Sequence, residues 1–368
     1  MTMNHTPYND AIGVALAAQS PLIVDGAMAT ELEKRGVNTA NALWSATALI
    51  DHPQAIHDVH LSYFEAGANI ATTDTYQANV PAFERLGLSQ ADAERLVARA
   101  AEEATAARDE YRRAQRLRTH CDKTAEPCGR KPTEERTAPP SPPLPPAPPT
   151  SPPTSMPSAT PAADRPLLIA GSIGPYGAFL ADGSEYTGDY ELTDSEYRDF
   201  HRPRMRALAD AGVDLFAFET MPNISEIRAL TGLLAEEFPD MQAWMSFSLR
   251  DAEHLCDGTD LGVAAEIAQA SQIGAVGINC VPLDMAEDAV HRLHESTDKP
   301  IIVYPNNGDV YHPETKTWTP HPTGLSLAGL APRWVEAGAS LIGGCCRTTP
   351  DDIRAVALAV SGPAAKHE

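Results

Sequence analysis

The chain has 368 residues, with 28 Lys plus Arg against 50 Asp plus Glu, so its formal net charge at pH 7 is −22. Such a charge argues against nucleic acid or an anionic membrane surface as a partner, and a cationic small molecule fits better. The length is compatible with one domain that buries a large core. No apolar run approaches the ~18 residues that a membrane span requires.

The N-terminal sequence and the number of cysteines both point to a reducing compartment. The first basic residue is Lys34, so the N-terminus lacks the positive flank of a signal peptide. Six cysteines are too sparse for a secreted disulfide framework. We therefore expect a cytoplasmic protein, and the sequence leaves its oligomeric state open.

Short apolar runs alternate with helix-like segments along the chain. Such runs are typical of strands buried on both faces of a parallel sheet. Eight are found, at residues 22–25, 69–73, 167–171, 215–219, 243–247, 275–279, 301–304 and 340–343.

Eight successive βα units predict a single (β/α)8 barrel, also called a TIM barrel, that spans residues 1–368. Several helices end in Ala-Gly, at Gly67, Gly212 and Gly338, where glycine accepts a left-handed conformation. A doubly wound open sheet is the alternative, but the even spacing and the polar strand ends favour closure. Residues 9–19 are expected to form a short helix over the barrel floor.

A proline-rich insertion interrupts the pattern between the second helix, at about residues 89–118, and the third strand. Thirteen of the 28 residues from 139 to 166 are proline. Proline at this density cannot join a helix or a sheet ladder, so residues 119–165 are expected to be disordered. An αβ connection lies at the floor of a barrel, away from the chemistry, which favours a tolerated loop over a docking segment.

Three cysteines lie at the ends of two predicted strands. Cys280 closes the sixth, and the adjacent Cys345 and Cys346 close the eighth. The carboxyl ends of barrel strands meet at one face, where three thiols predict a zinc site with one open position. Both adjacent thiols reach one metal only if the backbone turns between them. A buried apolar pair or a redox switch is the alternative.

Other candidate ligands are weaker. His57, His60, His291 and His294 are expected to be surface histidines, whereas His254 and Cys256 follow the fifth strand and could lie near the site. There is no P-loop and no glycine fingerprint of a dinucleotide fold, so neither ATP nor NAD is indicated.

Outside the insertion, the chain resembles the zinc-dependent homocysteine S-methyltransferases, most closely the bacterial members that use S-methylmethionine or S-adenosylmethionine. The combination of Asn-Cys with Gly-Gly-Cys-Cys-Arg is highly specific. The matching stretches are VDGAMATEL at 24–32, LWSA at 43–46, GSIGPYGA at 171–178, DGSEY at 182–186, FET at 218–220, GINC at 277–280, YPN at 304–306 and LIGGCCRTTP at 341–350.

The resemblance implies roles for particular residues. Cys280, Cys345 and Cys346 would be the Zn²⁺ ligands. Asp25 and Glu219 would hold the ammonium group of L-homocysteine, and the backbone amides of Gly26, Ala27 and Met28 its carboxylate. Trp44 and Tyr76 are candidates to face the cationic methyl donor through their rings. The alternatives are turn-capping carboxylates for Asp25 and Glu219, and ordinary rim packing for the two aromatic residues.

The implied reaction transfers a methyl group from a sulfonium donor to the homocysteine thiolate and forms methionine. Zinc would remove the thiol proton without a general base. Two alternatives stay open, namely a methyl-accepting module that depends on a corrinoid partner and a non-catalytic zinc or thiol sensor. Donor choice is undetermined, although the stretches at 183–186 and 257–259 resemble the sulfonium-using members.

Overall fold

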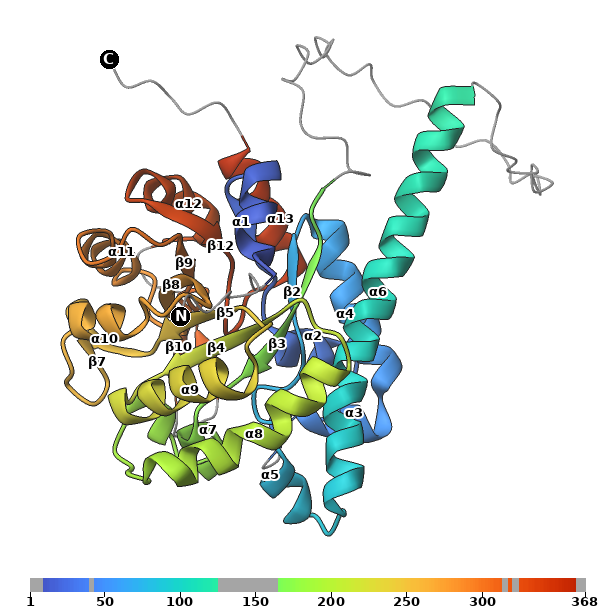
Figure 1. The fold of residues 1–368 in the computed structure, drawn as a ribbon. Coiled ribbons are helices and arrows are strands. Elements are labelled where there is room, and N and C mark those ends of the chain that lie inside the picture. The colour runs from blue at the N-terminus through green and yellow to red at the C-terminus, as the bar shows by residue number, and fades with distance from the viewer. Residues whose placement is uncertain (1–8, 40–42, 125–164, 313–316, 320–323, 362–368) are drawn as a thin grey trace, which may run out of the picture.

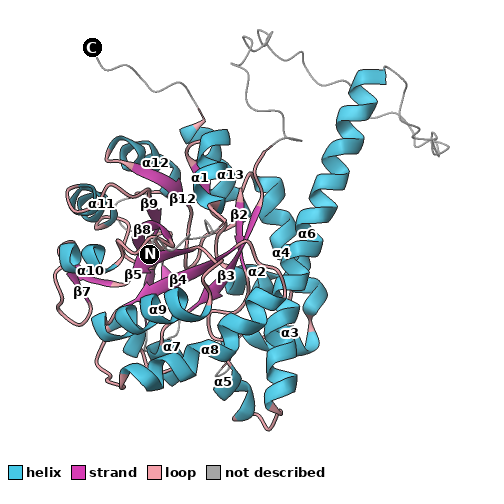
Figure 2. Cartoon of the chain, in the orientation of Figure 1, coloured by secondary structure: helices cyan, strands magenta, loops and turns pink. Residues whose placement is uncertain are grey.

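A computed structural model describes residues 9–39, 43–124, 165–312, 317–319 and 324–361 (Figure 1). Eight parallel strands form the centre and helices surround them (Figure 2). The strands are β1 (Leu22–Ile23), β2 (Ile70–Thr72), β3 (Leu168–Ile173), β4 (Leu215–Met221), β5 (Ala243–Phe247), β8 (Ile273–Asn279), β9 (Ile301–Tyr304) and β12 (Ala339–Ile342).

The sheet order β1-β12-β9-β8-β5-β4-β3-β2 follows the chain around a cylinder. A parallel bridge between Val24 and Ile70 joins its first and last strands. The eight predicted strands and the (β/α)8 barrel are therefore confirmed. Because the strands are parallel, all their carboxyl ends lie at one face, where a barrel carries its active site.

Helices form the outer layer, and two small antiparallel ribbons accompany them, β6 (Leu249–Asp251) with β7 (His254–Leu255) and β10 (Val310–His312) with β11 (Thr317–Thr319). The α-helices are α1 (Ala11–Ala18), α2 (Met28–Lys34), α3 (Ala48–Asp51), α4 (Pro53–Ala66), α5 (Val80–Glu84), α6 (Gln90–Thr124), α7 (Tyr176–Leu180), α8 (Asp194–Asp210), α9 (Ile224–Glu237), α10 (Leu261–Ile267), α11 (Ala286–His294), α12 (Leu327–Glu336) and α13 (Pro350–Val360). Two 3-10 segments are also present, η1 (Trp44–Thr47) between α2 and α3 and η2 (Ser184–Tyr186) between α7 and α8.

Three helix ends show why the Ala-Gly pairs are useful stop signals. Gly67, Gly212 and Gly338 have φ angles of 118°, 79° and 113°. Residues with a β-carbon pay a steric cost in this left-handed region, whereas glycine does not. Each glycine therefore lets the chain leave its helix and enter the following strand.

The short helix α1 covers the floor of the barrel, as expected for residues 9–19. Ile12 is fully buried and joins the core inside the barrel together with inward-facing strand residues such as Leu22 and Trp244. Its amide donates to Gln242 Oε1 at 3.0 Å, and Gln242 Nε2 donates to Asp10 Oδ1 at 2.9 Å. These contacts hold α1 at the end of the barrel opposite the strand carboxyl ends.

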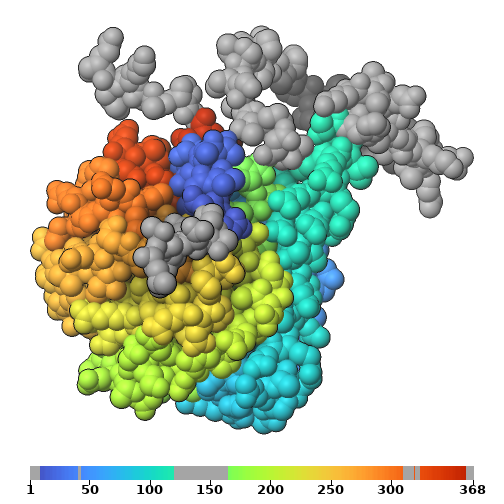
Figure 3. Space-filling model, viewed as in Figure 1, coloured from blue at the N-terminus to red at the C-terminus, as the bar shows by residue number. Residues whose placement is uncertain are grey.

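Helix α6 is longer than predicted. It has 35 residues, about 50 Å of helix, and its far half projects beyond the body of the molecule (Figures 1 and 3). Small side chains such as Ala100 and Ala104 are buried along its first half, and no residue from 112 to 119 is buried. Residues 119–124, assigned to the insertion from sequence, are helical. The prediction of disorder for the rest of 119–165 falls mostly on residues 125–164, outside the described residues.

Two histidines correct an expectation. His291 and His294 are exposed as predicted, but His60 is fully buried and His57 nearly so. Both lie on α4, which packs against α6, and His57 Nε2 lies 3.5 Å from Glu110 Oε2 on that helix. Burial lowers the pKa of His60 to about 3, so its ring is neutral. Among the described residues, no helix is both long and apolar enough to cross a membrane.

Candidate active site

A pocket opens at the carboxyl ends of the strands. Its lining combines thiols, carboxylates and aromatic rings. The pocket is lined by all ten residues to which the family resemblance gives a role, namely Asp25, Gly26, Ala27, Met28, Trp44, Tyr76, Glu219, Cys280, Cys345 and Cys346.

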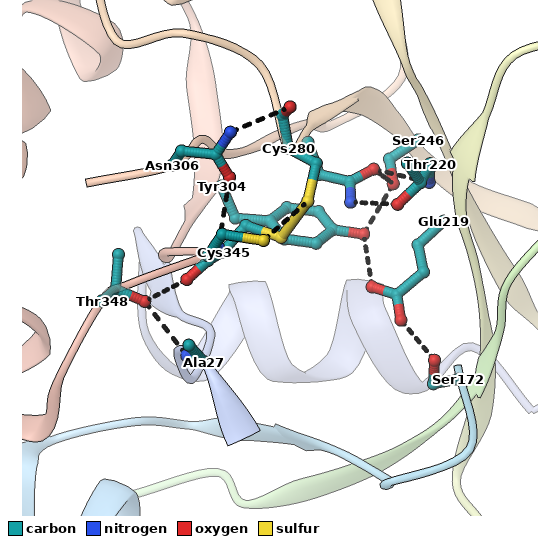
Figure 4. The surroundings of a disulfide bond; sticks show 12 residues. Ala27, Ser172, Glu219, Thr220, Ser246, Cys280, Tyr304, Asn306, Cys345 and Thr348 are labelled. Carbon is teal, nitrogen blue, oxygen red and sulfur yellow. Dashed lines mark hydrogen bonds between the residues drawn. A yellow bond between two sulfur atoms is a disulfide. The ribbon is translucent and has the colours of Figure 1, made fainter. Parts of the chain in front are cut away.

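The three predicted metal ligands converge at one side of this pocket. Their sulfur atoms all lie within 4.8 Å of one another. Cys346 Sγ is 3.7 Å from Cys280 Sγ, and the sulfurs of Cys280 and Cys345 are joined as a disulfide (Figure 4). This bond was not expected from the sequence. In the reduced chain the cluster offers three thiols, a set that could hold a metal ion.

Backbone turns bring the three sulfurs together. Cys280 and Arg347 adopt φ angles of 54° and 68°, which are uncommon for residues other than glycine. Asn306, just after β9, bridges the two cysteine segments, because its Nδ2 donates to the Cys280 carbonyl at 3.1 Å and its Oδ1 accepts from the Cys346 amide at 3.1 Å (Figure 4). The chain turns at Cys346 and Arg347, where the Thr348 amide donates to the Cys345 carbonyl at 3.2 Å, so the turn required at the adjacent cysteines is present.

The start of α13 anchors the other end of the cysteine loop. Thr349 and Asp352 form a capping box, with Pro350 in the first turn. The preceding Thr348 hydroxyl donates to the Cys345 carbonyl at 2.6 Å. The loop thus runs between a strand end and a capped helix, which restricts the positions of both sulfurs.

Asp25 follows β1 and is buried in the pocket wall. Thr72 donates to both of its carboxylate oxygens, from its amide at 2.9 Å and from its hydroxyl at 2.8 Å. Burial nevertheless raises the pKa of Asp25 to about 8, with a smaller contribution from the negative charge of Glu219. A cationic group in the pocket would favour its ionised form.

Glu219 lies near the end of β4 and is also buried. Ser172 donates to its Oε1, and the Tyr304 hydroxyl donates to its Oε2 at 3.2 Å (Figure 4). Burial raises the pKa of Glu219, and these two hydrogen bonds partly oppose the shift. Two buried carboxylates with raised pKa values thus face one pocket, as is typical of functional sites.

The turn at Gly26, Ala27 and Met28 lies beside the cysteine loop. The Ala27 amide donates to Thr348 Oγ1 at 3.1 Å (Figure 4). A ligand carboxylate that used this amide would have to replace or share that hydrogen bond. Gly344, which precedes the two cysteines, donates from its amide to the Asp25 carbonyl at 3.1 Å.

Aromatic residues form the outer wall. Trp44, in η1, has a φ angle of 49°, a strained conformation for a large side chain and one found at functional sites. Tyr76, in the loop after β2, and Tyr186, in η2, line the same pocket.

Asp257, from the stretch 257–259 that resembles the sulfonium-using members, does not line this pocket. It caps the start of α9, where its Oδ2 accepts a hydrogen bond from the Ile224 amide at 2.8 Å.

Two weaker candidates do not join the cysteine cluster. His254 Nδ1 lies 2.8 Å from Asp251 Oδ1, and Cys256 donates to Ser248 Oγ at 3.4 Å. Both side chains are partly buried on or beside the β6-β7 ribbon. These interactions account for them without a ligand role.

Sequence reasoning missed the residues that support the site. Thr72 was placed only inside the second predicted strand, and Asn306 and Ser172 only within matching stretches. Their strand-end position was the available signal, but their partners lie in other strands. Arg204, on α8, gave no signal, although its buried guanidinium donates to the carbonyls of Tyr76 and Gly174 at 3.0 and 2.7 Å.

The fold and the pocket define a (β/α)8 barrel protein with a centre of three converging cysteines. Residues 22–360 match the family model described as homocysteine S-methyltransferase. The chain belongs to this family.

Individual relatives cover nearly the whole chain. It is 43% identical to the homocysteine S-methyltransferase of Escherichia coli strain K12, over 95% of this chain and 98% of that protein. It is also 43% identical to homocysteine S-methyltransferase YbgG of Bacillus subtilis, over 92% and 94%. A selenocysteine Se-methyltransferase of Brassica oleracea is 39% identical, over 91% and 87%.

Solved structures of homocysteine methyltransferases have the same fold as this chain. The metallated form of the homocysteine methyltransferase MmuM from Escherichia coli matches with a TM-score of 0.73 and 40% identity, covering 95% of this chain and 99% of that chain. Its oxidized form matches with a TM-score of 0.73 and 41% identity, over 94% and 98%.

Proposed function

We propose that this chain transfers a methyl group from a sulfonium donor, S-methylmethionine or S-adenosylmethionine, to the thiolate of L-homocysteine and forms methionine. One observation carries the proposal. Three cysteine sulfurs lie within 4.8 Å of one another in the same pocket as two buried carboxylates, Asp25 and Glu219. That combination suits a ligand that carries both a thiol and an ammonium group.

Zn²⁺ is the metal that this donor set favours. Tetrahedral zinc binds thiolates at about 2.3 Å, which separates two ligand sulfurs by about 3.8 Å. The separation of 3.7 Å between Cys280 Sγ and Cys346 Sγ fits this arrangement. Burial raises the pKa of the Cys346 thiol to about 11, and a bound dication would offset that cost of ionisation. When bound, zinc would lower the pKa of the substrate thiol and leave it as the nucleophile.

The protein groups would orient homocysteine. Asp25 and Glu219 accept the substrate ammonium group, whose positive charge offsets the cost of burying two carboxylates. The amides of Gly26, Ala27 and Met28 receive the substrate carboxylate, with Thr348 yielding its contact to Ala27. Thr72 keeps Asp25 in place through two hydrogen bonds.

The donor would occupy the outer part of the pocket. Trp44 and Tyr76 line the pocket, and their aromatic rings would attract a sulfonium cation. The thioether product is neutral, so this attraction weakens after transfer. We also propose a cytoplasmic location, because a reducing compartment keeps Cys280 and Cys345 available as thiols rather than as a disulfide.

The test is a donor panel with the purified, reduced and zinc-loaded chain. Methionine should form from homocysteine with S-methylmethionine or S-adenosylmethionine and with no added protein. Absence of methionine with every donor would favour a corrinoid-dependent module.

Cys346→Ser should bind zinc at least about 10-fold more weakly and lose transfer, because one of three thiolate ligands is gone. Cys256→Ser is the matched control, since Cys256 lies outside the cluster, and it should retain both properties. Unchanged transfer in Cys346→Ser would contradict the proposed centre and favour a thiol sensor.

A further inference from the structure

Asp74 is a third buried carboxylate in the pocket wall, and the proposed binding of homocysteine does not use it. It follows β2 in the loop that also carries Tyr76, and its exposed fraction is 4%. Trp44 and Ser45, from η1, line the pocket beside it. Asp74 therefore belongs to the side of the pocket that carries the proposed donor-binding rings.

Only one oxygen of this carboxylate is satisfied within the described part of the chain. Ser45 Oγ donates to Asp74 Oδ1 at 2.5 Å, whereas Asp74 Oδ2 is buried without a hydrogen-bond partner. Asp25 and Glu219 differ, because both oxygens of each accept hydrogen bonds. A buried carboxylate oxygen without a donor is costly, so its presence in a pocket calls for a ligand.

The charge around Asp74 points to the kind of ligand. Burial raises the pKa of its carboxyl group to about 6, opposed only by the Ser45 hydrogen bond, with no basic side chain contributing. A ligand cation would supply the missing charge. Because Oδ2 needs a hydrogen-bond donor, a primary ammonium group fits, whereas a sulfonium or a quaternary ammonium group has no N–H to offer.

We propose that Asp74 is a specificity-determining residue whose Oδ2 binds the primary ammonium group of an amino-acid methyl donor. The inference rests on the proposed function. It divides donor recognition into two parts, since the sulfonium faces the rings of Trp44 and Tyr76 and the ammonium pairs with Asp74. S-methylmethionine and S-adenosylmethionine carry both groups, whereas betaine lacks the N–H bonds.

Two donors that differ in a single group make the test sharp. S-methyl-L-methionine and 4-(dimethylsulfonio)butanoate share the sulfonium, the chain and the carboxylate, and only the first has the ammonium group. Each is titrated into the reduced, zinc-loaded full-length chain by calorimetry, which requires no methyl transfer. The kinetic constants for each donor and for homocysteine are then measured separately.

Asp74→Asn keeps the shape and the acceptor for Ser45 but removes the charge. It should weaken S-methylmethionine binding, and raise its KM, by about 10- to 100-fold, the effect of one charge-assisted hydrogen bond. Binding of 4-(dimethylsulfonio)butanoate and the KM for homocysteine should change less than about 3-fold. Ser45→Ala, which removes the hydrogen bond to Asp74 Oδ1 but keeps the carboxylate, should weaken S-methylmethionine binding less than Asp74→Asn does and leave 4-(dimethylsulfonio)butanoate binding nearly unchanged.

Several outcomes overturn the inference. In one, the wild-type chain binds the two donors equally or binds neither. In another, Asp74→Asn weakens the binding of both donors equally. A third is a variant that mainly raises the KM for homocysteine, which would move Asp74 to the acceptor side. If donor binding behaves as expected but wild type forms no methionine, the proposed function fails and the assignment of Asp74 stands.

Discussion

Replacement of Arg204 by methionine should destabilise the pocket wall, because it removes hydrogen bonds to the loop after β2 and to the end of β3. Arg204 Nη1 donates to the carbonyls of Thr75 and Tyr76 at 3.2 and 3.0 Å, and Nη2 donates to the Gly174 carbonyl at 2.7 Å. One side chain on α8 thus ties the loop after β2 to the end of β3. Methionine has a comparable length and no donor, so it removes these bonds without leaving a large cavity.

The magnitude follows from burial. Arg204 is 1% exposed, and burial lowers the pKa of its guanidinium to about 10, whereas the negative charge of Glu226 opposes this shift. The substitution leaves three carbonyl oxygens without their donor and Glu226 without a nearby cation. Removing one partner from a buried set of charged groups costs about 3–5 kcal/mol, so the free energy of unfolding should fall by that amount.

Urea unfolding followed by circular dichroism measures this loss. Arg202→Met is the matched control on the same helix, because Arg202 is partly exposed and pairs with Asp199 and Glu237. Exposed pairs contribute about 0–1 kcal/mol, so this variant should stay close to wild type. The donor KM should rise only in Arg204→Met, since Tyr76 loses its anchor. Equal losses of stability in the two variants would refute the reasoning.

Three further predictions concern single residues of the pocket. Glu219→Gln should raise the KM for homocysteine by about 10-fold or more and leave the donor KM nearly unchanged, because it removes one charge facing the ammonium group; an effect on the donor alone would contradict the assignment. Burial holds the pKa of Asp25 at about 8, so its contribution to stability is complete below about pH 4 and is lost as the pH rises through about 8. The free energy of unfolding, measured with urea, should therefore fall less in Asp25→Asn than in wild type between pH 5 and pH 9. Parallel plots of this free energy against pH would contradict the raised pKa of Asp25. A β-carbon at Gly174 would lie 2.5 Å from the Tyr76 carbonyl oxygen, so Gly174→Ala should lower the thermal midpoint by several degrees in calorimetry, and an unchanged midpoint would contradict that close approach.

The eight strands were predictable because each is a short apolar run buried on both faces, a local pattern that survives folding. The helix ends at Gly67, Gly212 and Gly338 were equally local. By contrast, the burial of His57 and His60 depends on the elements that pack around α4, and sequence spacing on one helix does not reveal which face meets a neighbour. The same limit hid Arg204, whose partners belong to two other segments.

Within the site, the sequence by itself determined which side chains reach the pocket. A residue at the carboxyl end of a parallel barrel strand must lie at the rim, so Asp25, Glu219 and the three cysteines could be placed from order alone. That reasoning names residues at a common face. It does not say which atoms touch.

Only the tertiary structure decided how these groups meet. The approach of three sulfurs depends on left-handed turns at Cys280 and Arg347 and on Asn306, which joins two strand ends through both of its amide atoms. Asp74 is set apart from Asp25 in the same way, since one oxygen of Asp74 has no hydrogen-bond donor among the described residues, whereas both oxygens of Asp25 accept hydrogen bonds. Such contacts join residues far apart in the chain, and no local pattern encodes them, because they arise only when the strands close into a barrel.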